Sequence, residues 1–167
     1  MVNTLRRRDL LLSLAAVGLA PRAAMADTVD LRWTDLMPNG EIHVSPDLLG
    51  LIDHEGAPLI NQQPPSSGVR HEWSGRNVRL PGFIVPIEHQ GTDVVTFILV
   101  PYVGACVHIP PPPSNQLVLV TAKEPYESSG LFEPVEVTGL LGIATISTAL
   151  AEVGYTMSAD RVQSYRG

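Results

Sequence analysis

The stretch with the most distinctive chemistry is residues 100–116, which hold the only cysteine of the chain and a histidine two residues after it. In an extended strand, side chains at positions i and i+2 point to the same face, so Cys106 and His108 are expected to project together. A thiolate beside an imidazole is typical of a metal-ligand pair or of a nucleophile with its base. The pair therefore indicates either metal binding or thiol catalysis.

Metal binding is the first hypothesis for this pair. Thiolate and imidazole ligands favour zinc or copper over magnesium or calcium. Zinc generally takes three or four protein ligands, so Cys106 and His108 are incomplete by themselves. A further ligand is expected among His89, at the end of a neighbouring strand, Glu88 beside it, His71, His43 and His54. Spacing singles out none of them, and we take His89 to complete the zinc site.

Two other hypotheses use the same residues. In a thiol-dependent enzyme, Asn115 would orient the imidazole of His108; catalytic cysteines, however, usually lie at helix N-termini or tight turns and take their base from elsewhere in the chain, which argues against an enzyme. In a purely structural arrangement, Cys106 packs into the core and His108 bonds a backbone carbonyl. Asn115 and Gln116 then cap the returning chain through bonds to the backbone.

Four consecutive prolines follow the histidine and give a further alternative. A proline run forms a stiff polyproline II rod that cannot donate to an interior strand ladder, so it is expected at an exposed edge. Such a rod is a surface that aromatic-lined partners recognise. A non-catalytic interaction module would dock its partner through this edge, which consists of Tyr102, Pro110, Pro111, Pro112, Pro113, Asn115 and Gln116.

The elements that position these residues are short strands. Patterns rich in β-branched residues predict strands at residues 78–87, 94–101, 117–122, 135–141 and 155–157, with a bend at Gly82 and a turn at Gln90 and Gly91. Apolar spacing at residues 145–153 predicts one short C-terminal helix. The sequence therefore predicts a mainly β fold, a small antiparallel β-barrel of the oligonucleotide/oligosaccharide-binding (OB) type, with an irregular N-terminal extension in which Trp33 and Trp73 are core or lid aromatics.

The N-terminus reads as an export signal at residues 1–26. Three arginines precede an apolar run that is too short for a bilayer, which needs roughly 20 apolar residues, and a small-x-small cleavage site follows. Arg7 and Arg8 resemble a twin-arginine signal. We expect a soluble periplasmic protein with no transmembrane segment after cleavage, an irregular segment at 27–75 and a barrel domain at 76–167.

Charge and cysteine content limit the possible partners. Removing residues 1–26 from the 167 takes away four arginines and one aspartate, which leaves 7 basic and 16 acidic residues and a net charge of −9. Nucleic acid is therefore an unexpected partner, because no basic patch is present to meet its phosphates. A single cysteine cannot form an intramolecular disulfide in an oxidising compartment.

Four segments carry a resemblance to a known family. They begin at Trp33 (Trp-Thr-Asp-Leu), at Val78 (Val-Arg-Leu-Pro-Gly-Phe-Ile-Val-Pro-Ile), at Phe97 (running to Gln116) and at Val135 (Val-Glu-Val-Thr-Gly). The chain resembles an uncharacterised bacterial family, domain of unknown function 3299, whose members are periplasmic proteins or lipoproteins. The resemblance implies an association with ABC-type transporters, in some bacteria under zinc-responsive control. It favours a periplasmic accessory protein of an envelope transport system that binds zinc.

Overall fold

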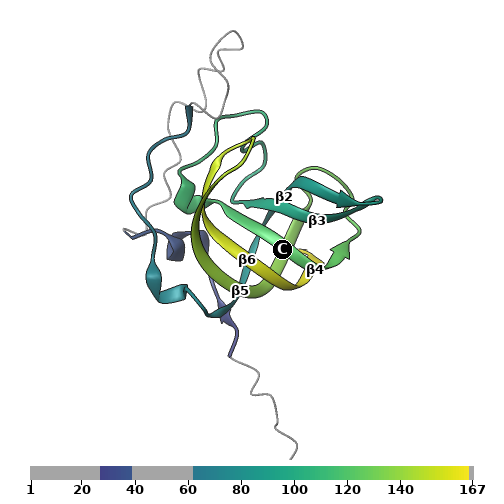
Figure 1. Ribbon diagram of the computed structural model, residues 1–167, viewed down its shortest axis with the longest axis horizontal. Coiled ribbons are helices and arrows are strands. Elements are labelled where there is room, and N and C mark those ends of the chain that lie inside the picture. The colour runs from purple at the N-terminus through teal and green to yellow at the C-terminus, as the bar shows by residue number, and fades with distance from the viewer. Residues whose placement is uncertain (1–26, 39–61, 166–167) are drawn as a thin grey trace, which may run out of the picture.

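The computed structural model describes residues 27–38 and 62–165, and the chain in these ranges is mainly β (Figure 1). The predicted export signal at residues 1–26 lies outside them. None of the helices in these ranges is long and apolar enough to cross a membrane. The strands are β1 (Val29–Asp30), β2 (Asn77–Gln90), β3 (Asp93–Val100), β4 (Val118–Tyr126), β5 (Pro134–Ser147) and β6 (Glu152–Ser164), and the 3-10 helices are η1 (Trp33–Leu36), η4 (His71–Trp73) and η5 (Ser114–Gln116).

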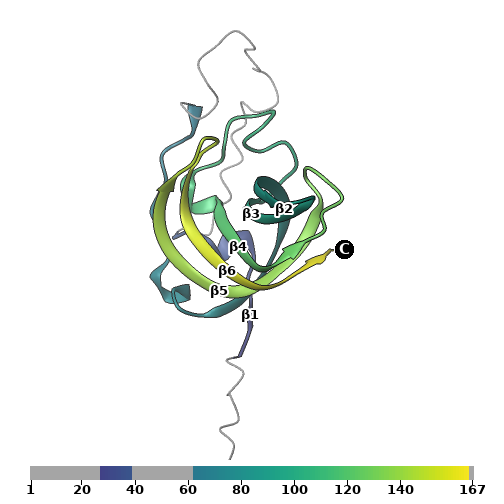
Figure 2. The same ribbon diagram turned by 45° about the vertical axis from the view of Figure 1, so that its right-hand side comes forward.

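Strands β2 to β6 close into a five-stranded barrel (Figure 2). The strand order is β2-β3-β4-β6-β5, and β5 pairs back with β2. All pairs in the ring are antiparallel except β4 with β6, which is parallel. This is the arrangement of an OB-type barrel, so the predicted fold class is confirmed, and all five predicted strands are present. The short strand β1 is added outside the ring, parallel to β2.

Gly82 marks the point where β2 changes its partner. Residues 77–83 pair with β5, and residues 83–90 pair with β3. A Cβ atom at Gly82 would lie 2.9 Å from Leu99 Cγ and 2.9 Å from the carbonyl oxygen of Val100. Only glycine therefore lets β3 approach β2 this closely, which confirms the bend predicted at this position.

The short helix predicted at residues 145–153 is wrong. Strand β5 continues to Ser147, β6 begins at Glu152, and a turn joins them. The Thr148 hydroxyl closes this turn by accepting hydrogen bonds from the N–H groups of Leu150 (3.1 Å) and Ala151 (3.0 Å). The β-branched residues favour strands, and the Thr148 hydroxyl favours a turn, and together these preferences are stronger than the helix-like spacing of the apolar residues. Ile146 and Leu150 pack on the outside of the barrel.

Two hydrophobic clusters hold the described residues together. The inner cluster fills the barrel with alternate side chains of all five strands and includes Trp33 and Leu36 from η1, which close one end. The outer cluster lies on the opposite face of β2 and β3, where Val85, Ile98 and Val100 are covered by residues of the β3–β4 connection. In an OB-type barrel a helix usually closes one end; here the N-terminal segment supplies a 3-10 helix.

Candidate functional site

The residues around the cysteine form a compact turn instead of a strand end. The carbonyl oxygen of Gly104 accepts hydrogen bonds from the N–H groups of Val107 (3.3 Å), His108 (2.9 Å) and Ile109 (3.2 Å). Cys106 has a left-handed backbone with φ of 67°. The expectation that Cys106 and His108 share one face is therefore wrong: the thiol is buried, and the imidazole is exposed.

Cys106 packs in the outer cluster rather than inside the barrel. Its side chain is 3% exposed and contributes to the cluster with Ala105 and Leu117. Burial raises the pKa of the thiol to about 12, so the thiolate is scarce at neutral pH. A buried, protonated thiol is a poor nucleophile and a poor metal ligand.

The three candidate zinc ligands do not assemble. The ring of His108 packs against Phe132, with a centroid distance of 6.0 Å, and His89 lies exposed on the β2–β3 hairpin. In the part of the chain that the structure describes, no group of three His, Cys, Asp or Glu side chains is close enough to hold a metal ion. Cys106, His108 and His89 therefore do not form a zinc site among the described residues, and the further candidates His43 and His54 lie outside those residues.

The proline run is an internal support, not an exposed rod. Pro111, Pro112 and Pro113 are buried, and Pro110 is half-buried, so the predicted docking edge is wrong in this respect. The Gln63 side chain donates to the carbonyl oxygens of Pro112 (2.9 Å) and Glu152 (2.8 Å) and accepts from the Glu152 N–H (2.8 Å). Prolines leave carbonyls without ladder partners, and a side chain from the preceding segment satisfies one of them.

Asn115 and Gln116 behave differently from each other. Asn115 Nδ2 donates to the carbonyl oxygen of Gly68 (2.7 Å) and to Ser67 Oγ (3.0 Å), so it ties down the returning chain as the structural hypothesis expects. Gln116 is fully buried, and among the described residues neither of its amide atoms has a hydrogen-bond partner. Only Asn115 therefore caps the chain.

The outer cluster covers a face that barrels of this type often use for ligands. Oligonucleotides and oligosaccharides commonly bind across the second and third barrel strands, which here are β3 and β4. The outward side chains Ile98, Val100 and Leu119 pack in the outer cluster beneath the β3–β4 connection. That connection presents half-buried Tyr102 and, beside it, Val103, which is 58% exposed.

The β4–β5 connection borders the same cluster and is ordered by Glu133. Its carboxylate accepts hydrogen bonds from Tyr126 Oη (2.9 Å), Ser128 Oγ (2.9 Å) and the Ser129 N–H (2.7 Å). Burial acts to raise the pKa of Glu133, but these hydrogen bonds outweigh it and lower the pKa. Within the loop, Phe132 packs against the outer cluster with φ of 61°, and its neighbour Leu131 is 47% exposed.

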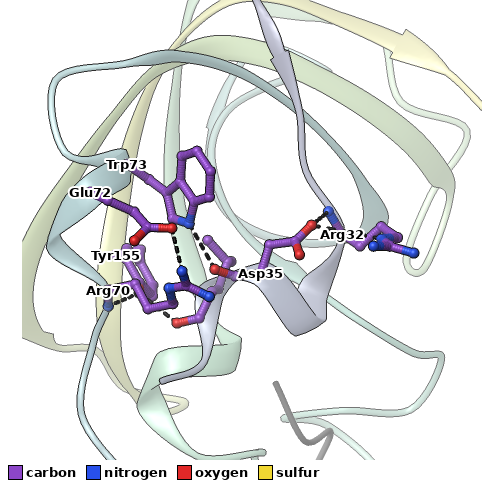
Figure 3. A network of polar contacts seen from close by, with 7 residues as sticks. Arg32, Asp35, Arg70, Glu72, Trp73 and Tyr155 are labelled. Atoms are coloured by element: carbon purple, nitrogen blue, oxygen red, sulfur yellow. Dashed lines mark hydrogen bonds and ion pairs between the residues drawn. The ribbon is translucent and has the colours of Figure 1, made fainter. Parts of the chain in front are cut away.

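The end of the barrel that η1 closes holds a network of polar contacts, which the sequence analysis did not predict (Figure 3). Tyr155 Oη donates to the carbonyl oxygen of Leu36 (2.6 Å) and accepts from the Arg70 N–H (2.6 Å). Trp73 Nε1 donates to the carbonyl oxygen of Asp35 (2.7 Å). These bonds join η1, η4 and β6, and the predicted core or lid role of Trp73 fits this position. Such partners are distant in sequence, so no local motif could have indicated them.

Comparisons with known proteins agree with this fold. A family model described as "Protein of unknown function (DUF3299)" matches residues 33–164. The crystal structure of a DUF3299 family protein from Pseudomonas aeruginosa PAO1 is 34% identical, with a TM-score of 0.71, over 84% of this chain and 98% of that chain. None of the curated proteins matches the chain.

Proposed function

Because the chain belongs to the DUF3299 family, whose function is unknown, its role has to be argued from its own residues, and we propose that it is a non-catalytic binding module of the bacterial envelope. Its binding surface is formed by the β3–β4 connection at residues 101–109 and the β4–β5 connection at residues 127–133. This loop surface replaces the proline edge as the docking site.

One observation carries the proposal: two large apolar side chains are exposed beside one cluster. Val103 and Leu131 lie on different connections, and their neighbours Tyr102 and Phe132 both pack against the outer cluster. Half-buried aromatic residues flanked by exposed aliphatic ones are characteristic of protein interfaces. The left-handed backbone at Cys106 and Phe132 is further support, since such strain is commonly kept at functional sites.

The competing hypotheses have less support. A thiol enzyme needs an accessible thiolate, whereas Cys106 is buried with a raised pKa. Within residues 27–38 and 62–165, zinc binding at Cys106 has no third ligand in its favour, and burial of the thiol leaves little thiolate to bind the metal. The loop surface needs no reactive group, and it uses the part of the connection that is exposed.

The proposed location is the periplasm, and the proposed partner is a protein component of an envelope transport system. The basic and apolar pattern of residues 1–26 supports export. The family resemblance to periplasmic proteins associated with ABC-type transporters supports the partner class. The acidic chain disfavours nucleic acid, and the connection that covers the β3 and β4 face disfavours oligosaccharides there.

Site-specific photo-crosslinking in living cells tests the proposal. A photoreactive amino acid is placed in turn at Val103, at Leu131 and at Leu140, which lies on β5 and is similarly exposed at 52%. We expect one and the same envelope protein to be crosslinked from the first two positions and not from Leu140. The Val103→Asp variant should lose the adduct formed at Leu131 while it keeps its unfolding free energy within about 0.5 kcal/mol.

Equal adducts from all three positions would indicate nonspecific contact and contradict a loop surface. A complete lack of adducts at Val103 and Leu131 would contradict it as well. In both cases, measuring the zinc content of the full chain and of the Cys106→Ser variant is an independent test of the zinc hypothesis. Metal bound stoichiometrically by the first and lost in the second would restore the zinc hypothesis.

A further inference from the structure

Strands β4 and β6 separate from each other near the C-terminal end of the chain. They pair in parallel from Val118 with Tyr155 to Ala122 with Ala159, and the pairing ends there. Beyond this point β6 stays with β5 as far as the pair of Ser164 with Val135. The register of β4 with β3 also shifts between Thr121 and Tyr126, so an irregular stretch draws β4 away from β6.

The separation leaves a cleft of about 180 Å³ between the two strands. Among its lining residues, Tyr126 and Val162 are half-buried and pack against the inner cluster, so the floor of the cleft is the barrel core. Within residues 27–38 and 62–165, no strand pairs with the edge of residues 161–164 that faces away from β5. An unpaired strand edge presents a row of backbone donors and acceptors.

Charged residues lie at the point beyond Ala122 and Ala159 where β4 and β6 separate, which we call the fork. The parallel register places Lys123 opposite Asp160, and the two side chains form an ion pair across the opening. The same register would place Glu124 opposite Arg161. No ion pair joins these two among the described residues, although both line the cleft. Glu124 and Arg161 therefore lack the cross-strand partner that a continued pairing would give each of them.

We propose that the fork binds an extended segment of a partner polypeptide as an added strand beside β6. Backbone edges of this kind are matched by peptide backbone, and side-chain pockets along them give specificity. Pro125 has no N–H to donate, so β6 rather than β4 supplies the ladder. The guest runs antiparallel to β6, because antiparallel pairing is slightly the more stable.

The lining of the cleft specifies the side chains of the guest. A valine or isoleucine covers the half-buried Val162 and Tyr126. On either side of it, a lysine meets Glu124 and a glutamate meets Arg161, which gives each unpaired charge an opposite partner. This interaction is separate from the loop surface around Val103 and Leu131 and goes beyond it.

A synthetic peptide and amide hydrogen exchange test the proposal on the full chain. The probe is an eight-residue peptide, blocked at both ends, that alternates threonine and valine and carries one lysine and one glutamate. We expect it to slow exchange of the backbone amides of Val162 and Ser164. The Tyr165 N–H bonds to the Pro134 carbonyl, and the alternation of an antiparallel ladder then leaves these two N–H groups facing away from β5. The same peptide with a central proline should give no protection, because proline interrupts the ladder.

Two charge-reversed variants supply the control. Arg161→Glu should weaken peptide binding by about tenfold, the effect of losing one favourable charged contact. Arg76→Glu carries the same charge change at an exposed position before β2 and should bind within about twofold of the wild type. An equal loss of peptide affinity in both variants would show that binding depends only on the net charge of the protein, and it would overturn the proposal.

Three further results of the peptide experiment would also overturn the proposal. No protection at about 1 mM peptide, or equal protection by the proline peptide, overturns the added strand. Protection that rises with protein concentration in the absence of peptide, together with a dimer in sedimentation, would assign the fork to a second copy of the chain and also overturn it. Binding measured in the Val103→Asp variant separates this result from the loop surface, because that substitution should leave peptide binding unchanged.

Discussion

The inner and outer clusters consist of similar apolar residues, but the side chains at their borders have different surroundings. The inner cluster has 17 buried residues and 6 half-buried ones, whereas the outer cluster has 8 buried and 7 half-buried. At the border of the inner cluster, Trp33 and Tyr155 give their polar atoms to backbone carbonyls. At the border of the outer cluster, aliphatic side chains such as Val103 face solvent.

The difference separates a structural end from an available surface. At the closed end, the polar atoms of Trp33 and Tyr155 already have backbone partners, so these two side chains gain little from a further protein. A border with exposed aliphatic and half-buried aromatic residues still has apolar area to lose on binding. The comparison therefore favours a structural role for the closed end, and it supports the proposal that the outer connections bind a partner.

The strongest test of the comparison is to remove the closure of the barrel end. Trp33 is buried in the inner cluster, and its Nε1 donates to the carbonyl oxygen of Pro81 (2.8 Å). Trp33→Ala should lower the free energy of unfolding by about 3–5 kcal/mol, measured by urea denaturation. Trp33→Phe keeps most of the volume and should lose much less. A loss below about 1 kcal/mol for Trp33→Ala would mean that the end plug is not structural.

Removing one hydroxyl group probes the same end more finely. Tyr155→Phe leaves the Leu36 carbonyl and the Arg70 N–H without their partner at a buried position. The expected loss of unfolding free energy is about 1–3 kcal/mol. Tyr165→Phe, at an exposed site after β6, is the matched control and should change it by less than about 0.5 kcal/mol. Equal effects of the two substitutions would remove the basis for a structural end.

The buried thiol of Cys106 in the outer cluster should change how the free energy of unfolding depends on pH. The pKa of Cys106 rises from 9.0 to about 12 on folding, so the unfolded chain loses this proton first as the pH rises. The thiol's contribution is complete below pH 9 and falls by about 1.4 kcal/mol per pH unit up to pH 12. Denaturation at pH 8 and pH 10 should therefore show a fall about 1.4 kcal/mol larger in the wild type than in Cys106→Ala. Parallel profiles would mean that the thiol is solvated.

The smallest expected effect is a gain in stability. Gln116 is buried with both amide atoms unpartnered among the described residues, so Gln116→Met should raise the unfolding free energy by about 1 kcal/mol. Asn115→Leu is the comparison, because it removes hydrogen bonds to Gly68 and Ser67 and should lower the same quantity by about 1–3 kcal/mol. A loss for Gln116→Met measured by thermal denaturation would show that the amide has a partner such as a buried water.

The strands could be predicted because their signals are local. Alternating or continuous β-branched residues indicate each barrel strand, and Gly82 marks the bend between its two pairings. The helix-like spacing at residues 145–153 misled because apolar side chains there cover the outside of the barrel. That surface exists only after β2 and β3 have paired, so a single segment cannot reveal it.

Sequence analysis singled out residues 100–116, and the structure shows a different local backbone there from the expected strand end. The i and i+2 rule holds only for an extended backbone, and the left-handed conformation at Cys106 turns the thiol inward while His108 stays exposed. The prolines were expected at the surface because they cannot join a ladder. Gln63, 49 residues away from Pro112, supplies the hydrogen bond that makes their burial possible. Such distant partners are decided by the fold.

The hydrogen bond between Tyr155 and Leu36 joins residues 119 positions apart in the chain. A ribosome delivers Leu36 long before Tyr155, so the barrel end cannot close until nearly all of the chain has been made. Contacts between such distant positions also slow folding, because a large loop must be ordered before they form. Until then the strands that will pair with β6 have open edges. Newly made chains of this protein should therefore depend on chaperone protection for longer than a helical protein of the same length.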